Sequence, residues 1–152
     1  MKFEIFILFS FIAIVVMIFQ LKKSSVKYIN IKIGDTEIKA EVADNIIKRT
    51  KGLMFRKTLS EKEGMLFVFN EESYHSFWMM NMSFPIDIIW INNEKKVVDI
   101  VENAQPCKLT CSSYRPKETA LYVLEVNANF TEKHGLEIGS SLEFELNAPG
   151  GI

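Results

Sequence analysis

Three charged side chains interrupt apolar segments and are the first candidates for chemistry in this sequence. Asp87 lies between two isoleucines, Glu125 lies between a leucine and a valine, and Arg56 follows the mostly apolar residues 52–55. If one of these carboxylates faces the interior, its burial demands a partner, and Arg56 could supply a bidentate pair. Together with Asn81, these residues predict a small polar pocket for an anionic or hydroxylated ligand. In a half-buried strand they could instead face solvent, and a buried ion pair is more often structural than functional.

A second chemistry would use Asp87 and Glu125 as the paired carboxylates of a hydrolase, one acting as general acid and the other as general base. It requires the two side chains to converge in one cleft. The sequence has no phosphate-binding glycine loop, no nucleophile elbow and no His-Glu-x-x-His motif. We therefore favour a binding role without covalent chemistry and without a cofactor, and the hydrolase stays as an alternative.

Soft metal ligands gather in one short segment, where His75, Met79, Met80 and Met82 fall within eight residues. Thioether and imidazole groups suit copper(I), so a copper-handling protein is a further alternative, with His75 and Met79 as the candidate ligands. In a regular strand His75 and Met79 share one face while the other two methionines share the opposite face. Because methionine also fills gaps in cores, we favour core packing for this segment.

The chain has two cysteines, Cys107 and Cys111, in a loop that contains proline and serine. A structural zinc site would need further ligands, and the whole sequence has two histidines. A catalytic thiol would need a nearby base and an orienting group. The spacing predicts a local disulfide, which is typical of an oxidising compartment.

The elements that must position these residues are mostly strands. Residues 29–42 alternate between apolar and polar around Gly34-Asp35, which predicts a hairpin, and Asp44 could cap a short helix through Lys51, with Gly52 as its C′ residue. Further strands are predicted at residues 65–69, 75–79, 86–91, 96–101, 120–126 and 142–146, and a helical turn at 130–134. Regularly spaced short strands indicate a mostly β, compact sandwich or barrel-like single domain with one or two short helices.

The N-terminal segment is of a different kind. Ile5 to Leu21 is an almost uninterrupted apolar run, and as a helix it would span roughly 25 Å at about 1.5 Å per residue. Lysines at both ends could extend its reach to the bilayer surface, and no small-residue cleavage site follows the run. We expect an uncleaved transmembrane anchor over residues 1–25 and a globular domain over 26–152. A cleaved signal peptide is the alternative.

Charge bears on partners and on orientation. Lysine plus arginine (18) nearly balance aspartate plus glutamate (19), so the chain offers no basic footprint for nucleic acid. Lys22, Lys23 and Lys27 would keep the domain cytoplasmic by the positive-inside rule, whereas the predicted disulfide indicates the opposite side. We expect a single-pass membrane protein whose domain lies outside the cytoplasm, is monomeric, and binds a small ligand or a protein partner.

Several motifs occur in an order that resembles the family called domain of unknown function 192. They are Val42-Ala-Asp44, Arg49, Gly52-Leu-Met-Phe-Arg56, Glu63-Gly-Met-Leu-Phe-Val-Phe69, Ser76-Phe-Trp-Met79, Asn81, Pro85-Ile-Asp87, Tyr122-Val-Leu-Glu125 and His134-Gly-Leu-Glu-Ile-Gly139. The resemblance covers about residues 28 to 146. It implies a mostly β, sandwich-like fold, usually secreted or anchored, with no established activity.

Overall fold

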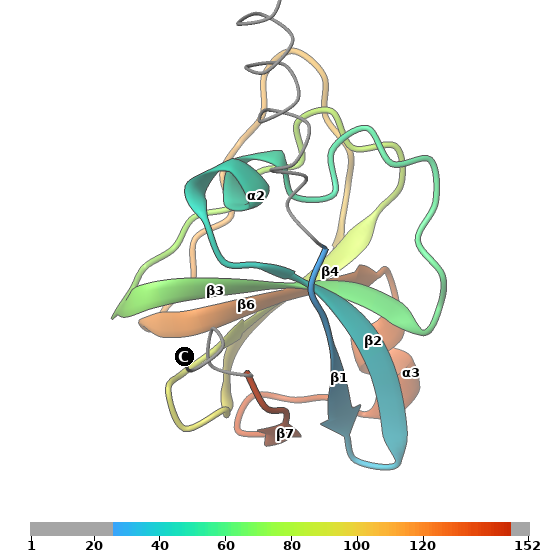
Figure 1. Ribbon diagram of the computed structural model, residues 1–152. Helices are drawn as coiled ribbons and strands as arrows, with labels where there is room; N and C mark the ends of the chain where they lie inside the picture. Colours follow the sequence, from blue (N-terminus) through green and yellow to red (C-terminus); the bar gives the residue numbers. More distant parts are fainter. Residues whose placement is uncertain (1–25, 147–152) are drawn as a thin grey trace, which may run out of the picture.

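The computed structural model describes residues 26–146, which form one seven-stranded sheet with two short helices (Figure 1). Along the sheet the strands follow the order β5-β4-β6-β3-β2-β1-β7. The strands are β1 (Tyr28–Ile33), β2 (Thr36–Ala43), β3 (Glu63–Ser73), β4 (Ile86–Ile91), β5 (Val97–Ala104), β6 (Ala120–Asn127) and β7 (Leu142–Glu143), and the helices are α2 (Ile46–Lys51) and α3 (Phe130–His134).

All neighbouring strands are antiparallel except β2 and β3, which are parallel. Parallel neighbours require a crossover, and here it is the segment that contains α2. The helix lies above β3 and β6 at one end of the sheet (Figure 1). Its N-cap is Asn45, whose side-chain oxygen accepts from Lys48 N–H at 3.0 Å. The predicted cap was one residue earlier, at Asp44.

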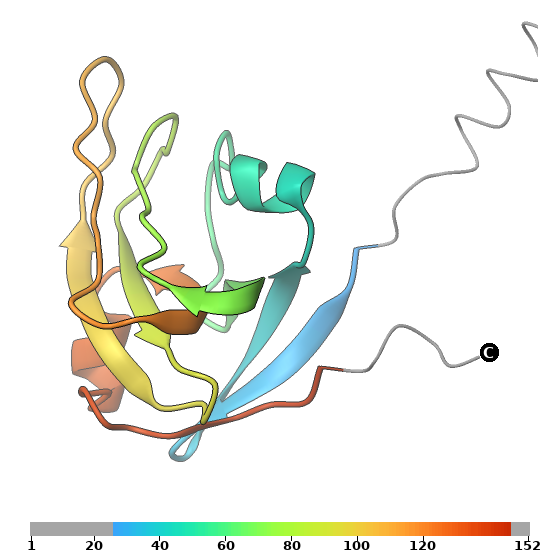
Figure 2. The same ribbon diagram turned by 90° about the vertical axis from the view of Figure 1, so that its left-hand side faces the viewer.

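The sheet is strongly curved into a half-barrel (Figure 2). At one end its two edges meet, because Leu142 N–H donates to Lys95 O and Val97 N–H donates to Ser140 O, both at 2.9 Å. At the other end the edges diverge, and α2 rises there together with the long loops 74–85 and 105–119 (Figure 2). One curved sheet therefore replaces the two stacked sheets of the predicted sandwich, and the barrel-like form is the one the protein adopts.

The middle strands are buried on both faces. All six residues of β4 are buried, and β6 alternates between two separate hydrophobic clusters. Leu124 and Val126 belong to a cluster that includes β1, β2 and α3, whereas Val123 belongs to a second cluster with Phe67 and Met79. Burial on both faces explains why the sequences of β4 and β6 are apolar almost throughout instead of alternating with polar residues.

One sequence prediction is wrong, and another concerns residues that the structure does not describe. Residues 75–79 form no strand; Phe77 makes an isolated bridge with Tyr114, and the segment is a loop over the second cluster. The predicted anchor, residues 1–25, lies outside the described residues. Within residues 26–146 no helix is long and apolar enough to cross a membrane.

Candidate ligand pocket

Glu125 lies at the base of a pocket of about 470 Å³ that opens beside α2. It belongs to the central strand β6, where it is opposite Met65 of β3 on one side and Ile88 of β4 on the other. The residue is 4% exposed, and its Oε2 atom has no hydrogen-bond partner among residues 26–146. Burial raises the pKa of the Glu125 carboxyl from 4.5 to about 8, against the opposing effect of the Arg56 charge. The carboxyl is therefore mostly neutral at pH 7, and can both donate and accept a hydrogen bond.

Two glycines lie close to Glu125, one beside its carboxyl and one against its backbone. Gly52 ends α2 with φ 49°, a conformation that side chains disfavour, and a Cβ there would lie 3.3 Å from the Phe67 ring and 3.9 Å from Glu125 Oε2. A Cβ at Gly64 on β3 would lie 2.8 Å from the backbone oxygen of Glu125, closer than real Cβ contacts. Gly52 therefore leaves room in the pocket beside the Glu125 carboxyl, whereas Gly64 lets β3 and β6 approach closely on the opposite face, where it pairs with Val126.

Aromatic rings form the walls of the pocket. Phe67 and Phe77 meet edge to face with centroids 4.8 Å apart, and Phe69 stacks on the His75 ring at 3.5 Å. Burial lowers the pKa of His75, so the imidazole beside Phe69 favours its neutral form. The full lining consists of Ile46, Arg49, Thr50, Lys51, Gly52, Leu53, Met54, Phe67, Phe69, His75, Ser76, Phe77, Trp78, Met82 and Glu125. Such a pocket, apolar with a few polar groups, is the usual form of a small-molecule site.

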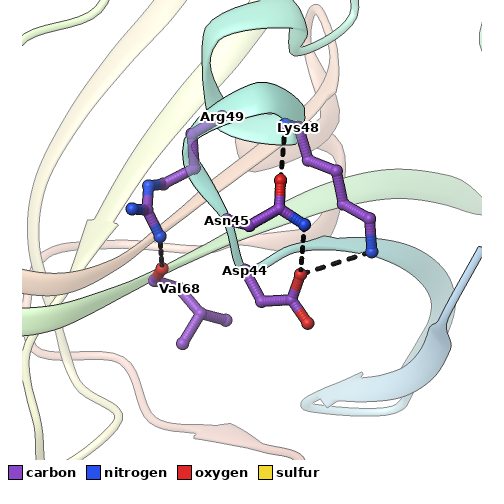
Figure 3. Close-up of polar contacts among 5 residues, drawn as sticks. All are labelled: Asp44, Asn45, Lys48, Arg49 and Val68. Carbon is purple, nitrogen blue, oxygen red and sulfur yellow. Dashed lines mark hydrogen bonds and ion pairs between the residues drawn. The ribbon is translucent and has the colours of Figure 1, made fainter. Parts of the chain in front are cut away.

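Arg49 places a positive charge at the pocket. It comes from α2, whose opposite side carries the Asn45 cap and the Lys48–Asp44 ion pair (Figure 3). The Arg49 side chain extends instead to β3, where Nη1 donates to Val68 O at 2.8 Å (Figure 3). Its guanidinium lies 5.2 Å from the centroid of the Phe69 ring. The contacts to a carbonyl and a ring leave the guanidinium without a carboxylate partner among the described residues.

Arg56 does not pair with either predicted carboxylate. It forms an ion pair with Glu41 of β2, and the Glu41 side chain is 15% exposed. Glu41 is opposite Met65, which is in turn opposite Glu125, so the two glutamates flank one methionine on the same face of the sheet. The ion pair therefore lies near Glu125 without satisfying it, and the predicted partner was wrong.

Asp87 belongs to the opposite face of the sheet. In the register of β4 and β6 it is opposite Val126, while Ile88 is opposite Glu125. Its carboxylate accepts from four donors: Asn103 N–H at 2.8 Å, Asn129 N–H at 3.2 Å, and the N–H and hydroxyl of Thr131 at 2.9 and 2.8 Å. Asp87 thus fastens α3 and β5 to β4. It does not converge with Glu125, and the paired-carboxylate hydrolase lacks its required geometry.

Asn81 is also outside the pocket. It is exposed, its backbone has φ 57°, and its amide donates to Met54 Sδ at 3.8 Å. Its backbone oxygen accepts from Phe55 N–H at 3.0 Å, which ties two loops together. Of the four predicted pocket residues, Glu125 lines the pocket, Arg56 acts on it through charge, and Asp87 and Asn81 have structural contacts elsewhere.

The two candidate copper ligands, His75 and Met79, also lie in different surroundings. His75 lines the pocket and its Nε2–H donates to Glu71 O at 3.1 Å, whereas Met79 is 1% exposed in the second hydrophobic cluster. Residues 26–146 contain no group of three or more His, Cys, Asp or Glu side chains able to hold a metal. Cys107 and Cys111 form a disulfide in the loop between β5 and β6.

Sequence reasoning missed Arg49, Gly52 and the aromatic walls as pocket residues. The available signal was the density of aromatic residues at 67–69 and 77–78, combined with a glycine directly after the predicted helix. Aromatic residues in apolar runs are ordinary core residues, so this signal becomes specific only when the two segments are known to face each other.

The profile of the family DUF192, described as uncharacterized ACR, matches residues 28–144. The chain is similar to UPF0127 protein PF1050 of Pyrococcus furiosus, with 36% identity over 115 residues that cover 71% of this chain and 90% of that protein. It is also similar to UPF0127 protein PYRAB11210 of Pyrococcus abyssi, with 32% identity over 113 residues that cover 71% and 87%.

Two solved structures have similar folds. A protein of Sinorhizobium meliloti 1021, described as a candidate transcription regulator, has a TM-score of 0.72 and 28% identity, covering 80% of this chain and 97% of that one. A protein of unknown function from Novosphingobium aromaticivorans has a TM-score of 0.66 and 30% identity, covering 78% and 84%.

Proposed function

Because the chain belongs to the DUF192 family of uncharacterized proteins, we propose its function from its own geometry: it is a binding module that holds a small ligand in the Glu125 pocket. The observation that carries the proposal is the Glu125 carboxyl, which is buried at the pocket base with Oε2 unpartnered. A buried polar atom without a partner costs about 1–3 kcal/mol, and a ligand that supplies the missing hydrogen bond recovers part of that cost.

The chemistry of the pocket defines the ligand class. A neutral carboxyl donates and accepts, which suits an amide or a hydroxyl group, while the rings of Phe67, Phe77 and Trp78 suit an apolar or aromatic body. Arg49 adds a cation near the wall formed by Phe69. The ligand is therefore a compact amphipathic molecule whose amide or hydroxyl reaches the base of the pocket.

We further propose that residues 1–25 tether this module to a membrane and that the domain lies outside the cytoplasm. Support for the tether is the apolar run from Ile5 to Leu21. Support for the compartment is the Cys107–Cys111 disulfide, since disulfides persist in oxidising spaces. Digestion of intact cells by an added protease tests the orientation, because a cytoplasmic domain would stay protected.

Ligand-observed NMR with benzamide as the probe tests the pocket. We expect benzamide to bind the wild-type protein at pH 6, where the Glu125 carboxyl is protonated, and to bind Glu125→Leu much more weakly because the variant cannot form the hydrogen bond. Glu145→Leu, which removes an exposed carboxylate far along the chain, is the matched control and should bind as the wild type does. Equal signals for wild type and Glu125→Leu would contradict the proposal.

A further inference from the structure

Exposed apolar side chains gather at the open end of the half-barrel. Within α2 no residue is buried, and Ile46 and Ile47 are 74% and 78% exposed. Phe55 is 70% exposed just after the helix, Trp78 is 47% exposed in loop 74–85, and Leu109 is 94% exposed in loop 105–119. We call these five residues the apolar crown. In a soluble domain, helical isoleucines normally face the core, so their exposure indicates a binding surface.

Backbone hydrogen bonds join the segments that carry the crown. Phe55 N–H donates to Asn81 O at 3.0 Å, and Cys107 N–H donates to Met79 O at 3.1 Å. The two long loops rise beside α2 at the same end of the molecule (Figure 2). The segments that carry the crown therefore lie at one end of the domain, and these hydrogen bonds connect their loops.

The chain enters the domain at this same end. Lys27 O accepts from Val42 N–H at 2.8 Å, and Val42 precedes the Asn45 cap of α2 by three residues. Residues 22–27 connect the apolar run to β1, and six residues span at most about 20 Å. A bilayer that holds residues 5–21 would therefore lie close to the crown.

Positive charge accompanies the apolar residues. The last turn of α2 contains Lys48, Arg49 and Lys51, and Lys108 is next to Leu109. Lys51 and Lys108 form no ion pair among residues 26–146, whereas Lys48 is paired with Asp44. Apolar side chains with flanking lysines are the composition of surfaces that insert into the headgroup region of anionic bilayers.

We propose that the apolar crown docks on the surface of an anionic lipid bilayer. Ile46, Ile47, Phe55, Trp78 and Leu109 enter the headgroup boundary, and the unpaired lysines contact anionic headgroups. Ile46 and Trp78 also line the Glu125 pocket, so the pocket opens toward the bilayer. The docking requires no pocket ligand, and the two proposals can fail separately.

Tryptophan fluorescence of the full-length protein in vesicles tests the docking. The chain has two tryptophans, Trp78 in the crown and Trp90, which is fully buried. In vesicles of brominated phosphatidylcholine and phosphatidylglycerol, we expect the wild type to lose emission relative to vesicles without bromine. Trp78→Phe should show no such loss, because only the shielded Trp90 remains. The same bromine effect in both proteins would overturn the proposal.

Two further variants separate docking from tethering and from ligand binding. Ile46→Asn combined with Ile47→Asn changes exposed side chains only, and it should reduce the quenching of Trp78 while the anchor is unchanged; unchanged quenching would overturn the role of α2. Glu125→Leu should retain full quenching even if it no longer binds benzamide. Cross-linked dimers with unquenched Trp78 would show that a second copy covers the crown, which would also overturn the proposal.

Discussion

Glu125→Gln should remove a pH dependence of stability that the buried carboxyl imposes on the domain. In the folded protein the pKa of Glu125 is raised from 4.5 to about 8. Below pH 4.5 the folded and unfolded states both hold the proton, so the carboxyl does not affect the free energy of unfolding. Between pH 4.5 and 8 the unfolded chain loses the proton while the folded chain keeps it. Stability therefore falls as pH rises through this window, and levels off above pH 8.

The magnitude follows from the width of the window. One pH unit over which the two states differ by one proton corresponds to about 1.4 kcal/mol. The interval from 4.5 to about 8 then corresponds to a loss of about 5 kcal/mol when pH is raised from below the window to above it. At pH 7 the loss already amounts to about 3 kcal/mol by the same conversion. Glutamine has a similar shape and does not titrate, so the variant lacks this loss.

Urea unfolding of the domain that begins at Val26, measured at steps between pH 5 and pH 9, is the assay. The stability of Glu125→Gln minus that of the wild type should increase with pH across the window and be constant above it. Glu145→Gln removes an exposed carboxylate and should give curves parallel to those of the wild type. If the wild type and Glu125→Gln show the same pH slope, the carboxyl is not held neutral by burial, and the argument for an amide or hydroxyl ligand fails.

Three other substitutions test contacts on the two faces of the sheet, each by the free energy of unfolding in urea. Gly64→Ala brings a Cβ to 2.8 Å from the backbone oxygen of Glu125 and should destabilise the domain by about 1–3 kcal/mol; a change near zero would mean that β3 moves easily. Asp87→Asn replaces a carboxylate that accepts from four donors with an amide, and it should lower the free energy of unfolding by about 3 kcal/mol. A loss smaller than that caused by the same substitution at an exposed aspartate would refute the role of Asp87 in fastening α3 and β5 to β4. Arg56→Leu leaves Glu41 largely buried and should cost about 2 kcal/mol, and adding Glu41→Gln should restore part of this; strict additivity would mean that the pair is not coupled.

Local sequence patterns were sufficient to predict the positions of most of the strands. Alternation around Gly34-Asp35 predicts a hairpin because a strand repeats every two residues, and β1 and β2 follow that pattern. Residues 86–91 are apolar apart from Asp87, and all six are buried in β4. Residues 75–79 have the same apolar character but form a loop. An apolar run signals burial, and a loop packed over a cluster is buried just as a strand is.

The partners of charged side chains could not be read from the sequence. Alternation specifies that Asp87 and Ile88 point to opposite faces, but which of them shares a face with Glu125 depends on the register between β4 and β6, strands that are separated by residues 92–119. Arg56 could have reached several carboxylates, and it pairs with Glu41 because the parallel crossover through α2 returns the chain above β2 and β3.

The sequence by itself determined that this protein has a β-rich domain with charged residues inside apolar strands, one pair of cysteines and an apolar N-terminal run, because composition and period-two patterning are local properties. The tertiary structure decided that the sheet curves into a half-barrel, that Asp87 is satisfied and that Glu125 is not. A buried polar group needs hydrogen-bond donors from distant segments of the chain. For Asp87 these donors are in Asn103 and Thr131, and only the folded arrangement brings them within hydrogen-bond distance.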